Sequence, residues 1–233
     1  MTGPASFHVL RDPSALSGIR RLITDRGWAR RQRGVAFIRV LGTSRGSSTG
    51  WSTDPHRTAV CAVWDSDDAL GTFVHGGATG HATPGLAGDH FALRLISGYG
   101  TWGGEAILDR VTPATGSEPG EVPGEVPGEV AVITRANVRL RAWPRFVRQG
   151  RLVSESAVVR GDLIDLLGFG EAPIGPVGTF SRWQSAAAVE SFHRSDAVHR
   201  EASRLERSGD WFRTELFARF AVTALPVPGR TGA

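Results

Sequence analysis

Apolar and polar positions along the chain follow the same order of periodicities twice. Apolar runs and alternation predict strands, and three- to four-residue spacing predicts helices. The first series gives a strand at about 6–11, a helix at about 14–31, strands at 35–42 and 58–64, a helix at 65–75 and a strand at about 91–101. The second gives a strand at about 130–141, a helix at about 144–158, strands at 162–169 and 177–183, a helix at 185–207 and a strand at about 216–223. Both series have the β-α-β-β-α-β order of a ferredoxin-like unit.

The two series also share aromatic positions. Trp64 and Trp183 are 119 residues apart, and so are Phe73 and Phe192. A self-similar period this long indicates duplication of a small domain. Because a ferredoxin-like unit has helices on only one face of its sheet, the other face needs cover. We therefore expect an α+β fold in which two tandem ferredoxin-like units pack sheet to sheet, as an α+β barrel around a central apolar cavity.

A tandem Pro-Gly-Glu-Val repeat at 118–130 separates the two series. Its Pro and Gly residues disfavour regular structure, which is typical of a flexible linker. We expect a first half at 1–115, the linker at 116–129, a second half at 130–224 and a flexible tail at 225–233.

Composition and charge narrow the class of protein. All 27 basic residues are Arg, which a GC-rich coding bias explains more simply than a nucleic-acid surface, because the formal net charge is only +4. No apolar run approaches the roughly 18 residues of a membrane span, and the N-terminal residues do not resemble a signal peptide. The single Cys61 cannot form an internal disulfide, and its place in a strand favours the core. These features fit a reducing cytoplasm.

The helix expected at 185–207 carries the best candidate for binding a cofactor. His199 continues the stripe of three- and four-residue steps that includes Phe192, whereas His193 lies on another face. A neutral imidazole directed from a helix into an apolar cavity is suited to ligate haem iron. The alternative is an ordinary hydrogen-bonded histidine. No Cys-x-x-Cys-His motif is present, so any haem would be held without covalent attachment.

A second histidine group could imitate a metal site in the first half. His75, His81 and His90 lie in or beside the glycine-rich stretch 76–88. Their spacings of six and nine residues match no compact zinc pattern, so a loop without a metal is the preferred interpretation.

Four segments of the second half carry a family resemblance. They are Gly-Phe-Gly-Glu-Ala-Pro at 168–173, Gly-Thr-Phe-Ser-Arg-Trp at 178–183, Ser-Asp-Ala-Val-His-Arg-Glu-Ala at 195–202, and Gly-Asp-Trp-Phe-Arg-Thr-Glu-Leu-Phe-Ala-Arg-Phe at 209–220. In order and spacing they resemble the C-terminal signature of the spheroidene monooxygenase family, which are haem-dependent oxygenases of acyclic carotenoids. Before Trp64 the similarity fades to the fold pattern. The resemblance implies a dimeric α+β barrel, a b-type haem, O2 chemistry, a homodimer, and His199 as the iron ligand.

Other residues complete the candidate site. Glu171 follows a glycine-rich turn, where it is either a turn carboxylate or an acid that delivers protons during O–O cleavage. Arg204 and Arg207 are candidates for neutralising the haem propionates. Trp183 and Phe192 are candidates for lining the cofactor and substrate site, although large aromatic side chains are more often ordinary core.

Three functions from different classes follow. The preferred one is a haem-dependent monooxygenase that acts on a carotenoid-like polyene or another hydrophobic natural-product scaffold, with an unidentified electron donor. The second is a haem- or small-molecule-binding barrel without turnover. The third is a cofactor-independent enzyme on the same scaffold, because one fold hosts unrelated functions.

Overall fold

The computed structural model describes residues 2–29, 31–44, 53–75, 88–114, 127–171, 176–195 and 211–226. Its strands are β1 (Ala5–Arg11), β2 (Val35–Ser44), β3 (Thr53–Trp64), β4 (Gly88–Gly100), β5 (Val130–Val138), β6 (Leu163–Gly170), β7 (Pro176–Trp183) and β8 (Phe212–Thr223). Its α-helices are α1 (Ala15–Ala29), α2 (Asp67–His75), α3 (Trp143–Val158) and α4 (Ala186–Ser195), and the short 3-10 helices are η1 (Ile107–Arg110) and η2 (Leu140–Ala142).

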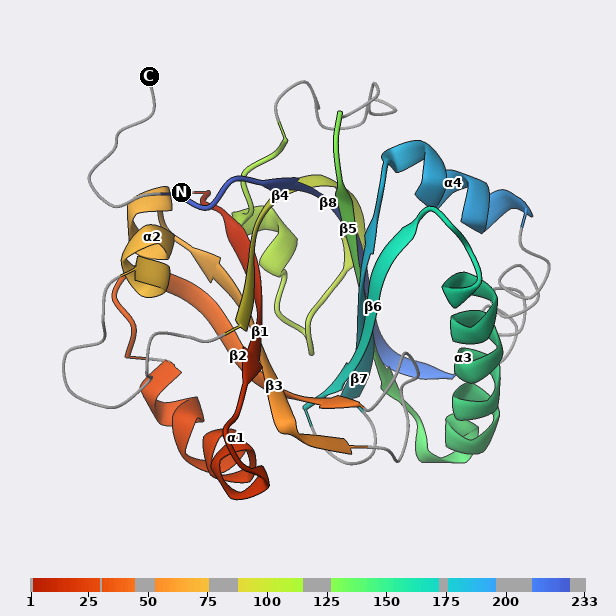
Figure 1. The fold of residues 1–233 in the computed structure, drawn as a ribbon, viewed down its shortest axis with the longest axis horizontal. Coiled ribbons are helices and arrows are strands. Elements are labelled where there is room, and N and C mark those ends of the chain that lie inside the picture. The colour runs from red at the N-terminus through yellow and green to blue at the C-terminus, as the bar shows by residue number, and fades with distance from the viewer. Residues whose placement is uncertain are drawn as a thin grey trace.

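The strand order confirms the expected duplication. The first half forms an antiparallel sheet in the order β4-β1-β3-β2, and the second half repeats it as β8-β5-β7-β6. The sheets join edge to edge, where β2 pairs with β6 through Gly42 and Gly170, and where β4 pairs with β8. The strands thus close into one barrel (Figure 1). The α+β fold built from two ferredoxin-like units is confirmed.

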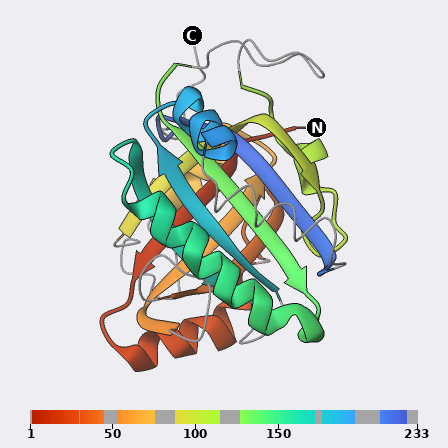
Figure 2. The ribbon, with the colours of Figure 1, turned by 90° about the vertical axis from the view of Figure 1, so that its right-hand side faces the viewer.

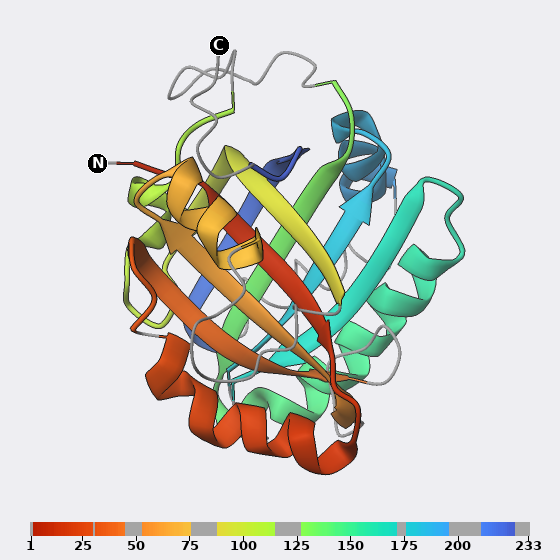
Figure 3. The ribbon, with the colours of Figure 1, turned by 60° about the vertical axis from the view of Figure 1, so that its left-hand side comes forward.

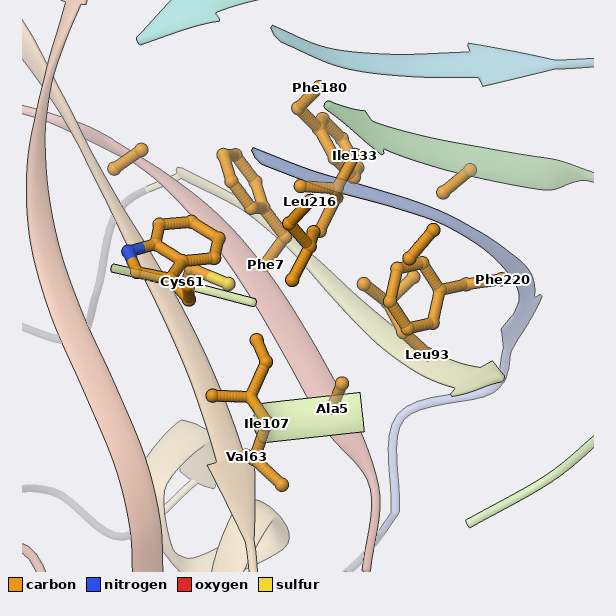
Figure 4. Packing of buried hydrophobic residues seen from close by; sticks show 14 of the residues in the cluster. Ala5, Phe7, Cys61, Val63, Leu93, Ile107, Ile133, Phe180, Leu216 and Phe220 are labelled. Atoms are coloured by element: carbon orange, nitrogen blue, oxygen red, sulfur yellow. The ribbon is translucent and has the colours of Figure 1, made fainter. Parts of the chain in front are cut away.

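The inside of the barrel is packed with side chains, so the expectation of a central cavity is wrong. Phe7 of the first half and Phe180 of the second stack with their ring centroids 4.1 Å apart, and both are fully buried. Ile133 and Leu216 join them, and Cys61 lies in the same cluster as expected (Figure 4). The physical reason is size, because a barrel of about eight strands is just wide enough for its own side chains to fill it.

The helices cover the outside of the barrel. α1 and α2 lie over the first sheet, and α3 and α4 lie over the second (Figures 2 and 3). Beneath α2, Trp64 contacts Phe73 with ring centroids 4.8 Å apart, and beneath α4, Trp183 contacts Phe192 at 5.2 Å. The aromatic pairs that suggested duplication in the sequence therefore make the same contact in both halves.

Several element boundaries differ from the expectations. The strand expected at about 130–141 ends at Val138, because Leu140–Ala142 forms a 3-10 turn that leads into Pro144 in the first turn of α3. β3 begins five residues before the expected start at Thr58. The helix expected at 185–207 is described as far as Ser195, and residues 196–210 lie outside the described ranges.

The linker expected at 116–129 falls mostly on residues 115–126, which are outside the described ranges. Its last residue contacts the second half. The Glu129 carboxylate accepts a hydrogen bond from Arg182 Nη1 at 2.9 Å, and its carbonyl accepts one from the Val222 amide at 3.0 Å. Within the described part of the chain, no helix is both long and apolar enough to cross a membrane.

Candidate functional site

A cavity of about 470 Å³ lies outside the barrel, between the outer face of the second sheet and helices α3 and α4. This volume falls within the range of roughly 300–1,000 Å³ that is typical of small-molecule sites. Side chains from β5, β7 and β8 form its floor, and side chains from α3 and α4 form its roof. Its lining includes Val132, Thr134, Thr179, Ser181, Trp183, Phe217 and Arg219 from the sheet, and Phe146, Gln149, Gly150, Val153, Ser154, Ala157, Phe192 and His193 from the helices.

Small residues on α3 leave the space open. Gly150, Ser154 and Ala157 recur at steps of three and four residues, so they share one face of the helix, and all three line the cavity. At the matching place in the first half, Trp64, Leu70 and Phe73 lie in one buried cluster. The second half has room for a small molecule above its sheet.

Trp183 and Phe192, which the sequence singled out as candidates, both line this cavity, and their role in binding a cofactor stays a prediction. Both are also almost fully buried members of the cluster under α3 and α4. The indole Nε1 of Trp183 donates a hydrogen bond to Ser181 Oγ at 3.0 Å, which fixes the ring orientation. The core and lining interpretations are therefore compatible, because the same rings close the hydrophobic cluster and form the cavity wall.

Arg219 and His193 meet at the cavity from different elements. Arg219 Nη2 lies 3.4 Å from His193 Nδ1, and the Arg219 Nε is buried without a hydrogen-bond partner in the described structure. Burial lowers the pKa of the Arg219 guanidinium, and the negative charge of Glu190 partly opposes this shift. Sequence reasoning missed Arg219 as a site residue. The available signal was alternation in the matched segment 209–220, which places Glu215, Phe217 and Arg219 on one face of β8.

Glu171 lies at the end of β6 in a cluster of arginines. Its Oε1 accepts hydrogen bonds from Arg135 Nε at 3.0 Å and Nη2 at 2.8 Å, and from Trp102 Nε1 at 3.1 Å. Arg39 Nε approaches its other oxygen at 3.8 Å. Arg135 is buried and lines the cavity, whereas Glu171 is not among the lining residues. The structure thus shows an anchored carboxylate that contacts the cavity wall through Arg135, and the proton-donating role of Glu171 stays a prediction.

The remaining candidate site residues are placed as follows. His199, Arg204 and Arg207 lie outside the described residues. His193, six positions before His199, is on the last turn of the described part of α4 and lines the cavity. His75 ends α2, which covers the first sheet, and is not among the lining residues of the cavity, and His81 lies outside the described residues.

A buried polar cluster in the first half was not predicted. His8 Nδ1 lies 2.9 Å from His90 Nδ1, and His8 Nε2 lies 2.8 Å from Ser6 Oγ. Trp64 Nε1 donates a hydrogen bond to the same Ser6 hydroxyl at 2.8 Å. Burial, aided by the charge of His90, lowers the pKa of His8 to about 3, so His8 is neutral at ordinary pH. Across the described ranges, no group of three or more His, Cys, Asp or Glu side chains is arranged to hold a metal ion.

The residues that line the cavity could hold a mainly apolar cofactor that carries carboxylates. Val132, Val153 and Phe192 supply apolar contact surface. The orphaned Arg219 Nε supplies a buried cationic donor of the kind that a propionate accepts from. A haem iron needs only one or two protein ligands, so a three-residue metal cluster is not required.

Comparison with known proteins agrees with the sequence motifs. No protein-family model matches the chain. The chain is 28% identical over 191 residues to spheroidene monooxygenase of Cereibacter sphaeroides. The aligned region covers 80% of this chain and 55% of that protein. It is 27% identical over 192 residues to spheroidene monooxygenase of Rhodobacter capsulatus. That alignment covers 80% of this chain and 75% of that protein. The chain thus spans about half the length of the first relative.

The resemblance to spheroidene monooxygenases is therefore confirmed, and it extends further than the motifs indicated. An alignment of 191 residues cannot fit within the second half alone, so the first half is also matched. Among solved structures, aldoxime dehydratase OxdRE in complex with butyraldoxime shares 10% identity and a TM-score of 0.56, over 95% of this chain and 80% of that one. At this identity the structural likeness supports the fold alone.

Proposed function

We propose that this protein is a haem-dependent monooxygenase that oxidises a hydrophobic small molecule, either a carotenoid-like polyene or another natural-product scaffold. The observation that carries the proposal is the cavity between the second sheet and helices α3 and α4. It lies in the half whose motifs resemble spheroidene monooxygenases. Similarity to relatives that are named monooxygenases supports an oxygenase function.

His199 is the proposed iron ligand, on the segment that follows α4. The last described turn of α4 lines the cavity through His193, and His199 follows six positions later in the sequence. Arg204 and Arg207 are proposed to face the propionates. When bound, haem b supplies the capacity to activate O2.

His193 is a less suitable iron ligand because of its contact with Arg219. A guanidinium can only donate, so a hydrogen bond from Arg219 makes His193 Nδ1 an acceptor. In the neutral ring the proton then lies on Nε2. A ligating histidine, in contrast, commonly donates its other ring N–H to a carboxylate, carbonyl or water. The contact with Arg219 therefore favours His199 over His193.

The described residues have a binding and shielding role in this proposal. Trp183, Phe192 and Phe217 offer aromatic surface to an apolar substrate and exclude water from it. One hydroxyl of Thr134 and Thr179, whose oxygens are 2.6 Å apart, donates to the other across β5 and β7. This contact reduces the unmet polar groups that β5 and β7 present to a hydrocarbon.

Reconstitution with haemin tests the proposal. We expect the wild-type chain to bind haemin with one Soret band typical of imidazole ligation, and to convert a polyene to a product that incorporates one atom of 18O from 18O2 when a reductant is supplied. His199→Ala should lose this spectrum, and added imidazole should restore part of it. The matched control, His193→Ala, should keep an imidazole-ligated spectrum.

Three results would count against the proposal in different ways. A wild-type chain that binds no haemin would favour a cofactor-independent protein. Full haem binding without product from any polyene or other lipophilic candidate would favour a haem-binding protein without turnover. An unaltered spectrum in His199→Ala together with a lost spectrum in His193→Ala would move the ligand to His193.

A further inference from the structure

We propose that Arg219, which contacts His193, forms a carboxylate-binding end of the cavity that orients an amphiphilic ligand with its acid group toward β8 and α4. The proposal deepens the proposed function, because it concerns the same cavity.

The charged side chains that line the cavity differ in how well they are paired. Of the two arginines among the described lining residues, Arg135 is paired with Glu171 through two hydrogen bonds. Glu190, the acidic residue whose charge acts on Arg219, forms its own ion pair with Arg194 at 3.0 Å. Within the described part of the chain, Arg219 retains a buried Nε without a hydrogen-bond partner. An anion is the group that would complete this site.

Removal of a cation from water costs free energy. A charge removed from water destabilises the protein unless it is paired and hydrogen-bonded. Burial lowers the pKa of Arg219, and the charge of Glu190 partly opposes this shift. Contact with the Phe217 ring, whose centroid lies 5.6 Å from the Arg219 Cζ, offsets only part of this cost. A carboxylate accepting from the guanidinium would offset much more.

His193 holds the Arg219 side chain at the cavity. Arg219 Nη2 lies 3.4 Å from His193 Nδ1, and because a guanidinium can only donate, Nδ1 accepts. This contact leaves the Arg219 Nε without a partner in the described structure. A carboxylate has two oxygens and can accept from a fork of two guanidinium donors.

The charge of the lining side chains changes sign along β8. Glu215 and Arg219 line the cavity on the same face of the strand, with Phe217 between them. Four residues of a strand extend about 13 Å, so the negative and positive side chains lie well apart. A ligand acid is repelled at the Glu215 end and attracted at the Arg219 end, and its apolar body lies against Phe217.

The acid group could come from either of two sources, and both present the same chemistry. One source is a propionate of the haem. The other is a carboxylate on the substrate. Titrations with haemin, with haemin dimethyl ester and with laurate distinguish them, and quenching of tryptophan fluorescence reports binding without turnover because Trp183 lines the cavity.

The experiment compares the wild-type chain with Arg219→Leu and Arg219→Lys. The matched control is Arg213→Leu, because Arg213 is exposed on the same strand and is not a lining residue. Loss of a charge-assisted hydrogen bond should weaken binding of the carboxylate ligand roughly 10- to 100-fold in Arg219→Leu. Arg219→Lys should lose less, and the control should bind as the wild type. Circular dichroism of each variant verifies that it is folded.

Each outcome has a defined meaning. Weaker binding of haemin, with unchanged binding of its dimethyl ester, supports the proposal and assigns the acid to the cofactor. Weaker binding of laurate, with unchanged haemin, supports it and assigns the acid to the substrate. Equal losses for haemin and its ester, or no loss for any ligand, overturn it. If the wild type binds no haemin, the proposed function fails, and the laurate arm still tests the carboxylate site.

Discussion

Trp183 and Phe192 lie with their ring centroids 5.2 Å apart at an interplanar angle of 35°, which repeats the contact of Trp64 with Phe73 at 4.8 Å and 43°. The same contact therefore closes the outer cluster of both halves. Only the surroundings differ, because Trp183 and Phe192 also border the cavity. The same packing unit is thus found in both halves, and in the second half it also borders a cavity.

Removing each phenylalanine should separate these two roles. Phe192→Ala and Phe73→Ala should each lower the free energy of unfolding by about 3 kcal/mol or more, because both side chains are buried. Urea denaturation measures this loss. Phe192→Ala should also weaken haemin binding, whereas Phe73→Ala should leave the affinity unchanged. Equal effects of the two variants on affinity would argue against the cavity as the cofactor site.

Glu171→Gln should lower stability because it leaves the buried Arg135 without its carboxylate. We expect a loss of roughly 1–3 kcal/mol, the usual cost of an unsatisfied buried group, and a partial recovery in the double variant with Arg135→Met. Thermal denaturation of the wild type, the two single variants and the double variant measures the coupling between Glu171 and Arg135. Glu105→Gln is the control, because Glu105 pairs with Arg39 from an exposed position.

The same Glu171 variant tests the proton-donor hypothesis. If Glu171 delivers protons, turnover per bound haem should fall roughly 100-fold while the haem content is retained. Turnover should be measured at a temperature where the variant is fully folded, so that lost stability does not mimic lost chemistry. Unchanged turnover would limit Glu171 to anchoring Arg135.

His8 should make the protein sensitive to acid. Its pKa is about 3 in the folded protein, against an ordinary value of 6.5, so the unfolded chain binds a proton that the folded chain does not between these limits. Stability is therefore retained above about pH 6.5 and lost as the pH falls toward 3, with a slope near 1.4 kcal/mol per pH unit from this group. His8→Asn should flatten the profile of urea midpoints between about pH 4 and 6, whereas His56→Gln, at an exposed position, should not. An unchanged slope in His8→Asn would assign the acid sensitivity to other groups.

Deletion of residues 119–126 should leave the fold intact. The segment is the Pro-Gly-Glu-Val repeat, and loop length has only a small effect on stability. Glu129 must be kept, because it bonds to Arg182 and Val222. A melting temperature within a few degrees of the wild type is expected by circular dichroism, and a chain that fails to fold would show that the repeat is structural.

The amino-acid sequence by itself determined the elements and their duplication. Alternation and three- to four-residue spacing are local properties, so they predicted the order of strands and helices in both halves. The recurrence of Trp and Phe at a fixed offset predicted equivalent packing. Family motifs led to Glu171 and Trp183, the recurrence of aromatic residues led to Phe192, and Trp183 and Phe192 do line the cavity.

Only the tertiary structure decided where space for a ligand remains. Pairing of β2 with β6 and of β4 with β8 closes the barrel, so Phe7 and Phe180 meet and fill its interior. The cavity instead forms outside, where the small residues of α3 face β5 and β7. The contact between Arg219 and His193 likewise joins residues 26 positions apart in the sequence. Such relationships depend on contacts between distant segments, which local periodicity does not encode.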